Sequence, residues 1–290
     1  GFEYSNTGTG SNDTPAYAYD GRRYLAGYDT EDGEGGPSAH LSVTDLRTGR
    51  SFGFTNVACC EGVPAFRAAR DGSLVALTPG EDLFVKRPGH RARTLSSTTP
   101  RDLAMRGGTV YWTESGVARS TVLDGIGGGE VLMLEPVRMD RRAGCEGRAI
   151  AAAGSVRVLA RGDRRVGCRI GGPARFPAGA AGDPLPRIVG GRWLLRRTAG
   201  TARVMDTRSG HAVALAAGVR DATLLRDGTL AWIDDAGRVL ARPPGGDALT
   251  LSTGEASALA AARRAVYWTE AGVAKVYRPT SAARSASKPG

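Results

Sequence analysis

The chain has 290 residues, of which 41% are hydrophobic and 42 are glycine, and its formal net charge is +10. This hydrophobic content is enough for an ordinary core, and no run approaches the ~20 apolar residues that a transmembrane helix needs. Only three of the 39 basic residues are lysines, and the arginines are spread along the chain. The charge therefore indicates no nucleic-acid surface.

The first predicted element is a strand at Phe2–Ser5, followed by a polar loop over residues 6–13. Hairpin signatures then recur to the end of the chain: a turn, an apolar strand, a glycine turn and a second apolar strand. The clearest copies are residues 108–118, 228–239 and 264–274. We expect two-residue turns at seven dipeptides, which are Asp20-Gly21, Asp71-Gly72, Gly107-Gly108, Ala153-Gly154, Gly190-Gly191, Asp227-Gly228 and Arg263-Arg264.

Each hairpin has room for a strand before it and a strand after it. Four strands in about 40 residues is the size of a propeller blade. A blade cannot bury both of its apolar faces alone, so blades must stack in a closed ring. The sequence therefore predicts one all-β domain over residues 1–280, a seven-bladed β-propeller of four-stranded antiparallel blades, and a polar C-terminal tail over residues 281–290.

The last repeat offers only three strands. We expect Phe2–Ser5 to supply the fourth strand of the last blade, because closing the ring removes an exposed sheet edge. The alternative is that this strand inserts into a neighbouring molecule and builds a filament. A monomer is the first expectation and the filament is the second.

An acidic insertion interrupts the first repeat at residues 29–37, between its second and third strands. It carries four carboxylates among glycines, at Asp29, Glu31, Asp32 and Glu34. Carboxylate oxygens are the ligands that Ca²⁺ takes in proteins, so these residues are candidate Ca²⁺ ligands, although their spacing differs from an EF-hand loop. The alternative is a solvated acidic loop without an ion. No other cofactor is indicated.

The four cysteines are Cys59, Cys60, Cys145 and Cys168. Four cysteines allow three pairings, and we prefer Cys145 with Cys168 because both lie in one repeat. The adjacent Cys59 and Cys60 form either a vicinal disulfide or bonds to different partners. An even number of cysteines in a chain that begins without methionine favours an oxidising compartment. We therefore expect a secreted, cell-surface or periplasmic protein.

Length variation between repeats points to one face of the predicted ring. Residues 6–13, 29–37 and 136–144 and the Cys59–Cys60 segment fall in second-to-third strand loops or in connections between blades. These positions share one face of a regular propeller, so we expect that face to bind the partner. Among the inserted residues, Arg138, Arg141 and Arg142 are candidates for holding an anionic ligand. A solvated run of charge is the alternative.

The tetrapeptides Tyr111-Trp112-Thr113-Glu114 and Tyr267-Trp268-Thr269-Glu270 resemble the YWTD motif of lipoprotein-receptor-type propellers and their bacterial relatives. The surrounding Asp-Gly-x-apolar pattern is similar to that of TolB-like propellers. This sequence departs from the YWTD pattern because Glu replaces the final Asp and because those propellers have six blades. The resemblance implies a binding role toward proteins or peptides, and it implies that these Tyr and Trp side chains pack between blades.

No local pattern typical of catalysis occurs in the sequence. His40, His90 and His211 lie in different repeats, so no pair has metal-ligand spacing. We therefore expect an exported, non-catalytic propeller that binds a protein or glycan partner. The alternatives are a propeller lyase or hydrolase that acts on an extracellular polymer, with a site assembled from distant strands, and a self-assembling extracellular subunit that exchanges its terminal strand.

Overall fold

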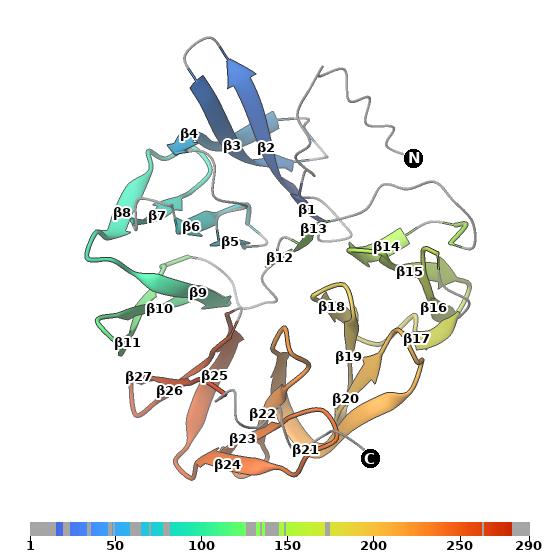
Figure 1. Cartoon of the computed structure of the whole chain (residues 1–290). Coiled ribbons are helices and arrows are strands. Elements are labelled where there is room, and N and C mark those ends of the chain that lie inside the picture. The colour runs from blue at the N-terminus through green and yellow to red at the C-terminus, as the bar shows by residue number, and fades with distance from the viewer. Residues whose placement is uncertain are drawn as a thin grey trace.

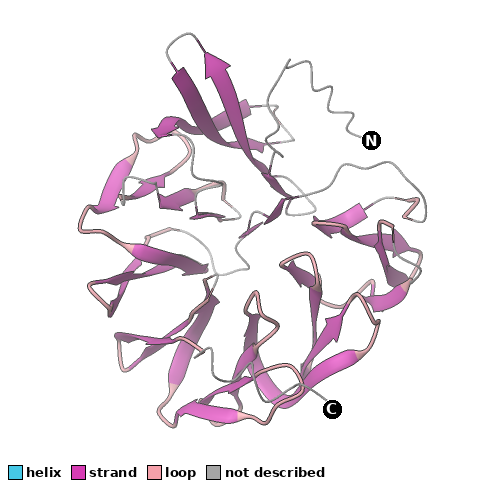
Figure 2. Cartoon of the chain, viewed as in Figure 1, coloured by secondary structure: helices cyan, strands magenta, loops and turns pink. Residues whose placement is uncertain are grey.

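The computed structural model describes residues 16–19, 24–33, 36–45, 48, 50–58, 65–69, 71–77, 82–125, 132–133, 135–136, 145–147, 149–171, 175–262 and 264–279. All regular secondary structure in these residues is β-strand (Figure 2), as predicted. No helix that could cross a membrane occurs in this part of the chain.

The residues up to 136 that are described form three antiparallel sheets (Figure 1). Their strand orders are β13-β1-β2-β3-β4, β12-β5-β6-β7-β8 and β11-β10-β9. The strands are β1 (Ala16–Tyr19), β2 (Tyr24–Gly33), β3 (Gly36–Asp45), β4 (Arg50–Ala58), β5 (Ala65–Ala68), β6 (Leu74–Leu77), β7 (Leu83–Lys86), β8 (Arg93–Ser96), β9 (Arg101–Arg106), β10 (Thr109–Glu114), β11 (Val117–Val122), β12 (Leu132–Met133) and β13 (Glu135–Pro136).

Residues 149–277 contribute three further sheets, with the orders β14-β15-β16-β17, β18 through β24 in sequence, and β25-β26-β27. The seven-stranded sheet contains two hairpin repeats, because the long strand β21 pairs with β20 through its first half and with β22 through its second half. The strands are β14 (Ala149–Ala153), β15 (Val156–Arg161), β16 (Arg164–Arg169), β17 (Phe176–Ala180), β18 (Arg187–Val189), β19 (Trp193–Thr198), β20 (Gly200–Asp206), β21 (Ala212–Leu224), β22 (Leu230–Asp234), β23 (Val239–Arg242), β24 (Leu249–Ser252), β25 (Ala256–Ala261), β26 (Val266–Glu270) and β27 (Val273–Tyr277).

Every one of the seven predicted hairpins forms as an antiparallel pair. Their turns, however, are not uniformly two residues long. The Asp71 carboxylate accepts the N–H of Ser73 at 2.8 Å, and Gly72 has a φ of 92°. This is the three-residue hairpin loop, in which a left-handed glycine follows a type I turn. The same arrangement recurs at Asp227, whose carboxylate accepts the N–H of Thr229 at 2.9 Å.

The predicted acidic loop is largely strand. Residues 29–33 belong to β2 and residues 36–37 belong to β3, with Asp29 opposite His40 and Glu31 opposite Ser38. The two strands therefore extend through most of the insertion and leave only residues 34 and 35 between them. The prediction of a loop between the second and third strands was wrong because unbroken cross-strand pairing continues along this hairpin.

The sheets stand around a common centre (Figure 1), so the architecture is that of a β-propeller. The order around the ring departs from the chain order, because β25–β27 lies against β9–β11 (Figure 1). Tyr111 and Tyr267 stack there with ring centroids 5.9 Å apart. The Tyr111 hydroxyl bonds to the Thr269 hydroxyl at 2.7 Å, and the Tyr267 hydroxyl bonds to that of Thr113.

These reciprocal bonds fix how the two sheets face each other. In each strand the tyrosine precedes the threonine by two residues, so β10 and β26 must run antiparallel. Two equivalent sheets therefore meet through equivalent faces, as in a two-fold contact. Ring closure between the last repeat and the N-terminal sheet, which chain order predicted, is replaced by this contact. Phe2–Ser5, the expected closing strand, lies outside the described residues.

Two ion pairs also show that equivalent sheets have opposite orientations. Arg106 is the last residue of β9 and bonds at 2.6 Å to Asp221. Asp221 lies three residues before the end of β21, where the turn to β22 begins. Arg278, beyond β27, bonds at 2.7 Å to Asp102 near the start of β9. Equivalent turns in the two halves thus lie at opposite ends of their sheets. The single-face argument from loop lengths assumed equal orientation, and that assumption was wrong for this contact.

Candidate binding groove beside Trp268 and Glu270

The repeated tetrapeptide builds the same polar network twice. In β10, the Trp112 indole N–H donates to Glu114 Oε1 at 3.0 Å, and the Ser96 hydroxyl of β8 donates to the same oxygen. In β26, the corresponding donors are Trp268, at 3.2 Å from Glu270 Oε2, and Ser252 of β24, at 2.6 Å. Each glutamate thus links its own strand to the outer strand of the preceding hairpin repeat.

These donors lower the pKa of both carboxyl groups. For Glu270 the bond from Ser252 is the largest cause, followed by the bond from Trp268. For Glu114 the order is the same, with Ser96 before Trp112. Hydrogen bonds to the ionised form stabilise it. Both glutamates are therefore carboxylates at neutral pH.

The aromatic residues of the motif pack between sheets, as the sequence predicted. Trp112 lies in a core cluster with residues of β6 and β7, and Trp268 lies in one with residues of β22 and β23. Tyr111 and Tyr267 are 0% exposed and share a third cluster with alanines. Burial raises the pKa of Tyr267 to about 12. None of these rings offers an open face to a ligand.

A groove lies beside the second copy of the network. It is a shallow hollow of about 380 Å³ lined by Thr250, Leu251, Ser252, Thr253, Trp268, Glu270 and Lys275. Three hydroxyl side chains, one carboxylate and one exposed ammonium group therefore surround a single space. Lys275 contributes to the low pKa of Glu270, although no ion pair joins the two residues among those that the structure describes.

The outer strand of this sheet has an open edge. In the described part of the chain, β27 pairs with β26 alone. The turn at Ala271 and Gly272 has two residues of positive φ, at 48° and 76°, which places Glu270 and Val273 in a hydrogen-bonded pair. The backbone N–H and C=O groups of the alternate residues, Ala274 and Val276, therefore face the open edge.

The disulfide prediction is confirmed for one pair. Cys145 and Cys168 are bonded, with their Cα atoms 5.6 Å apart. Cys59 and Cys60 lie outside the described residues, as do Glu34, Arg138, Arg141 and Arg142. Asp29, Glu31 and Asp32 lie in β2. The Ca²⁺ site and the anion site on the insertion therefore stay predictions.

The three histidines lie in or beside three different sheets. His90 and His211 are exposed, and His40 lies in β3 of another sheet. No group of three His, Cys, Asp or Glu residues that could hold a metal occurs among the residues described. Sequence reasoning missed Ser96 and Ser252, but a signal was present: the tripeptide Thr-Leu-Ser ends 18 residues before the glutamate in both copies.

No family model and no curated protein matches this chain. Among solved structures, it is similar to Kluyveromyces lactis Hsv2p at 10% identity, over 87% of this chain and 96% of that chain, with a TM-score of 0.27. It is also similar to the Dos1 propeller at 10% identity, over 89% of this chain and 75% of that chain, with a TM-score of 0.31. Both TM-scores are low, so these likenesses carry no argument about function.

Proposed function

We propose that this chain is an exported, non-catalytic, seven-bladed β-propeller that binds an extended segment of a partner protein along β27. The observation that carries the proposal is the open edge of β27 beside the groove. An extended peptide can add a strand to such an edge through main-chain hydrogen bonds, while pockets for alternate side chains supply specificity. Here the open backbone groups belong to Ala274 and Val276, and the groove lies alongside.

The groove contributes side-chain recognition of mixed character. Val273, which starts β27 and lies outside the groove lining, is 55% exposed and offers an apolar contact on the same strand. The hydroxyl groups of Thr250 and Thr253 offer hydrogen bonds, and the charges of Glu270 and Lys275 favour a polar or zwitterionic segment. A glycan partner is less favoured, because the Trp268 ring, the aromatic platform of this groove, is only 5% exposed.

The blade count, the export and the absence of catalysis each have a separate support. Seven hairpins support seven blades, with β21 shared between two of them. The Cys145–Cys168 disulfide is compatible with an oxidising compartment. Glu270 is a poor candidate for a general acid, because the bonds from Ser252 and Trp268 lower its pKa, away from the neutral range that general acid–base catalysis favours.

The test is a selection of displayed random peptides on the wild-type protein, followed by binding measurements on two variants. Val276→Pro removes an outward N–H without removing a bond to β26, because Pro is tolerated on open edges. We expect it to abolish binding, and Glu270→Gln to weaken binding of peptides that carry a cationic residue. Amide hydrogen exchange at Ala274 and Val276 should slow when peptide binds. Peptides that bind wild type and Val276→Pro equally would refute the edge as the binding surface.

Terminal-strand assembly is the second candidate, because the same open edge could receive Phe2–Ser5 of another copy. Sedimentation over a range of protein concentrations tests this proposal, with a variant that lacks residues 1–8 as the comparison. Association of the full chain that disappears in the truncated variant supports strand exchange. A full-length monomer at every concentration rejects it, and tighter peptide binding by the truncated variant would instead show that Phe2–Ser5 covers the edge of its own molecule.

A further inference from the structure

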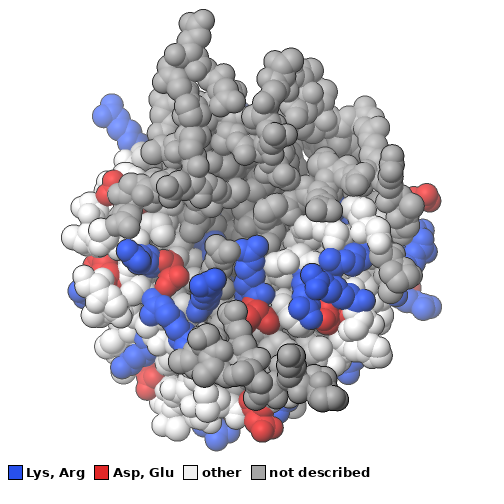
Figure 3. All heavy atoms as spheres, in the orientation of Figure 1, with Lys and Arg blue, Asp and Glu red and all other residues white. Residues whose placement is uncertain are grey.

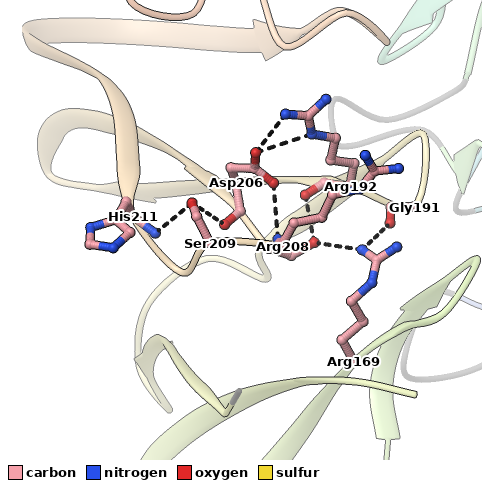
Figure 4. A network of polar contacts seen from close by, with 8 residues as sticks. Arg169, Gly191, Arg192, Asp206, Arg208, Ser209 and His211 are labelled. Carbon is pink, nitrogen blue, oxygen red and sulfur yellow. Dashed lines mark hydrogen bonds and ion pairs between the residues drawn. The ribbon is translucent and has the colours of Figure 1, made fainter. Parts of the chain in front are cut away.

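Positive charge is spread over the described surface, but one cluster differs from the rest. Figure 3 shows several groups of Lys and Arg side chains on the described part of this face, with fewer Asp and Glu between them. Figure 4 shows Arg192 bonded to the Asp206 carboxylate through its side chain, Arg208 bonded to it through its backbone N–H, and Arg169 bonded to the Gly191 carbonyl beside them. Arg169 ends β16, Arg192 lies in the turn before β19, and Arg208 lies in the turn after β20. This cluster shares no residue with the groove beside Trp268.

Both oxygens of the Asp206 carboxylate accept hydrogen bonds within the cluster. Its Oδ2 accepts from Arg192 Nε at 3.1 Å and from Nη2 at 2.7 Å, and its Oδ1 accepts from the Arg208 backbone N–H at 2.9 Å. Burial raises the pKa of Asp206, but these bonds outweigh burial and hold the pKa below its ordinary value. One negative charge is thus committed to Arg192.

The other two guanidinium groups have no carboxylate partner among the described residues. Arg169 Nη1 donates only to neutral acceptors, the Gly191 carbonyl at 3.2 Å and the Thr207 hydroxyl at 3.4 Å. Burial and then the neighbouring charge of Arg208 lower the pKa of Arg169. The cluster therefore carries two uncompensated positive charges that repel each other, a situation that a bound anion relieves.

The cluster is held in place before any ligand arrives. The Arg192 guanidinium lies 4.2 Å from the centre of the Trp193 ring, in cation–π geometry. Thr207 donates its hydroxyl to the Arg192 carbonyl at 2.6 Å and its N–H to the same carbonyl at 2.9 Å. These bonds fasten the turn that carries Arg208 to the turn that carries Arg192. The backbone of the turn is therefore in place when a ligand binds, and the exposed Arg208 side chain is what the ligand must order.

We propose that Arg169 and Arg208 form a binding site for a tetrahedral oxyanion, a phosphate or sulfate group either free or as a monoester. A guanidinium group presents a planar fork of N–H donors that fits two oxygens of such an anion. Arg208 is exposed and Arg169 is half-buried, so the anion enters from solvent and reaches the inner guanidinium. The charge of a phosphate dianion equals the two uncompensated charges of the site.

The experiment titrates wild-type protein with inorganic phosphate and sulfate, and separately with phenyl phosphate and phenyl sulfate, at constant ionic strength set with chloride. Dissociation constants come from NMR shifts of the amides of Arg208 and its neighbours. Arg208→Gln removes a side chain without touching the bond between its backbone and Asp206. Its loss of a charge-assisted bond should weaken binding about tenfold, and Arg169→Gln with Arg208→Gln should abolish it.

Arg164→Gln is the matched control, because it removes the same charge from the opposite end of β16, where the side chain is 81% exposed. We expect it to bind as wild type does. Binding of the esters as well as the free ions supports a site for a modified partner, and binding of the free ions alone supports a site for a small anion. Equal affinities in Arg208→Gln and Arg164→Gln, or no binding by wild type at 50-fold excess over protein, would overturn the proposal.

Discussion

The contact between β10 and β26 makes a prediction that chain order alone would not. Residues 111 and 269 are 158 positions apart, yet their hydroxyl groups are 2.7 Å apart. We therefore expect a double-mutant cycle between Tyr111→Phe and Thr269→Val to reveal a coupling between them. In a propeller whose blades follow the chain order with equal orientation, these two residues would not meet, and their effects would add.

The size of the coupling follows from the burial of the two partners. Tyr111 is 0% exposed, whereas Thr269 is half-buried, so water can reach the threonine hydroxyl after the tyrosine hydroxyl is removed. Each single substitution should then cost about 1 kcal/mol, near the middle of the range for neutral hydrogen bonds. The double variant should cost little more than one single variant, which corresponds to a coupling of about 1 kcal/mol.

The assay is urea unfolding at neutral pH. Free energies of unfolding are compared between variants for which this free energy falls with urea concentration at the same slope. Tyr111→Phe combined with Thr201→Val serves as the control, because Thr201 lies in β20 and bonds to Thr198. That pair should be additive within about 0.4 kcal/mol. If the effects of Tyr111→Phe and Thr269→Val also add within this limit, the antiparallel contact between the two sheets is refuted.

Three further predictions concern stability. Burial raises the pKa of Tyr267 to about 12, whereas a tyrosine in the unfolded chain has a pKa of about 10. The unfolded state therefore releases the proton first, and stability should fall by about 3 kcal/mol between pH 10 and 12; Tyr267→Phe should flatten this part of a stability–pH curve. Gly167→Ala would place a Cβ atom 1.8 Å from the ring of buried Phe176, so its urea midpoint should reveal a loss of about 1–3 kcal/mol, and an unchanged midpoint would contradict the packing. Reducing the Cys145–Cys168 bond, which spans 23 residues, should cost about 3 kcal/mol, and an unchanged melting temperature after reduction would show that the bond does not constrain the unfolded chain.

The local elements of the fold could be predicted from sequence because a few residues are enough to specify a turn. Glycine marked six of the seven predicted hairpins, and paired arginines stand at the last one. Turn length was harder. Asp-Gly predicted two residues with positive φ, but the Asp71 carboxylate bonds to the N–H of Ser73 and stabilises a longer loop. A side chain that competes for backbone donors therefore changed the turn without removing the hairpin.

The arrangement of sheets could not be predicted in the same way, because stacking depends on which faces fit. Tyr111 and Tyr267 offer identical faces, so either could pack on a different neighbour or on each other. The arginine cluster had no signal either, since Arg169, Arg192 and Arg208 come from three elements and resemble the other arginines in sequence. The Glu270 network did have a signal in the sequence, because the repeated tripeptide Thr-Leu-Ser accompanies the repeated tetrapeptide.

The two copies of that network also explain why only one of them is a candidate site. In the first copy, Arg119 reaches Glu114 Oε2 at 3.4 Å and occupies the free side of the carboxylate. In the second copy, the corresponding cation is Lys275, whose ammonium group is a compact point charge on a flexible stem. No ion pair between Lys275 and Glu270 forms among the described residues. Gly254 adds to the difference, because a Cβ atom there would lie 2.1 Å from Glu270 Oε1. The groove therefore lies beside the copy whose carboxylate packs on a glycine and has no ion-paired arginine among the described residues.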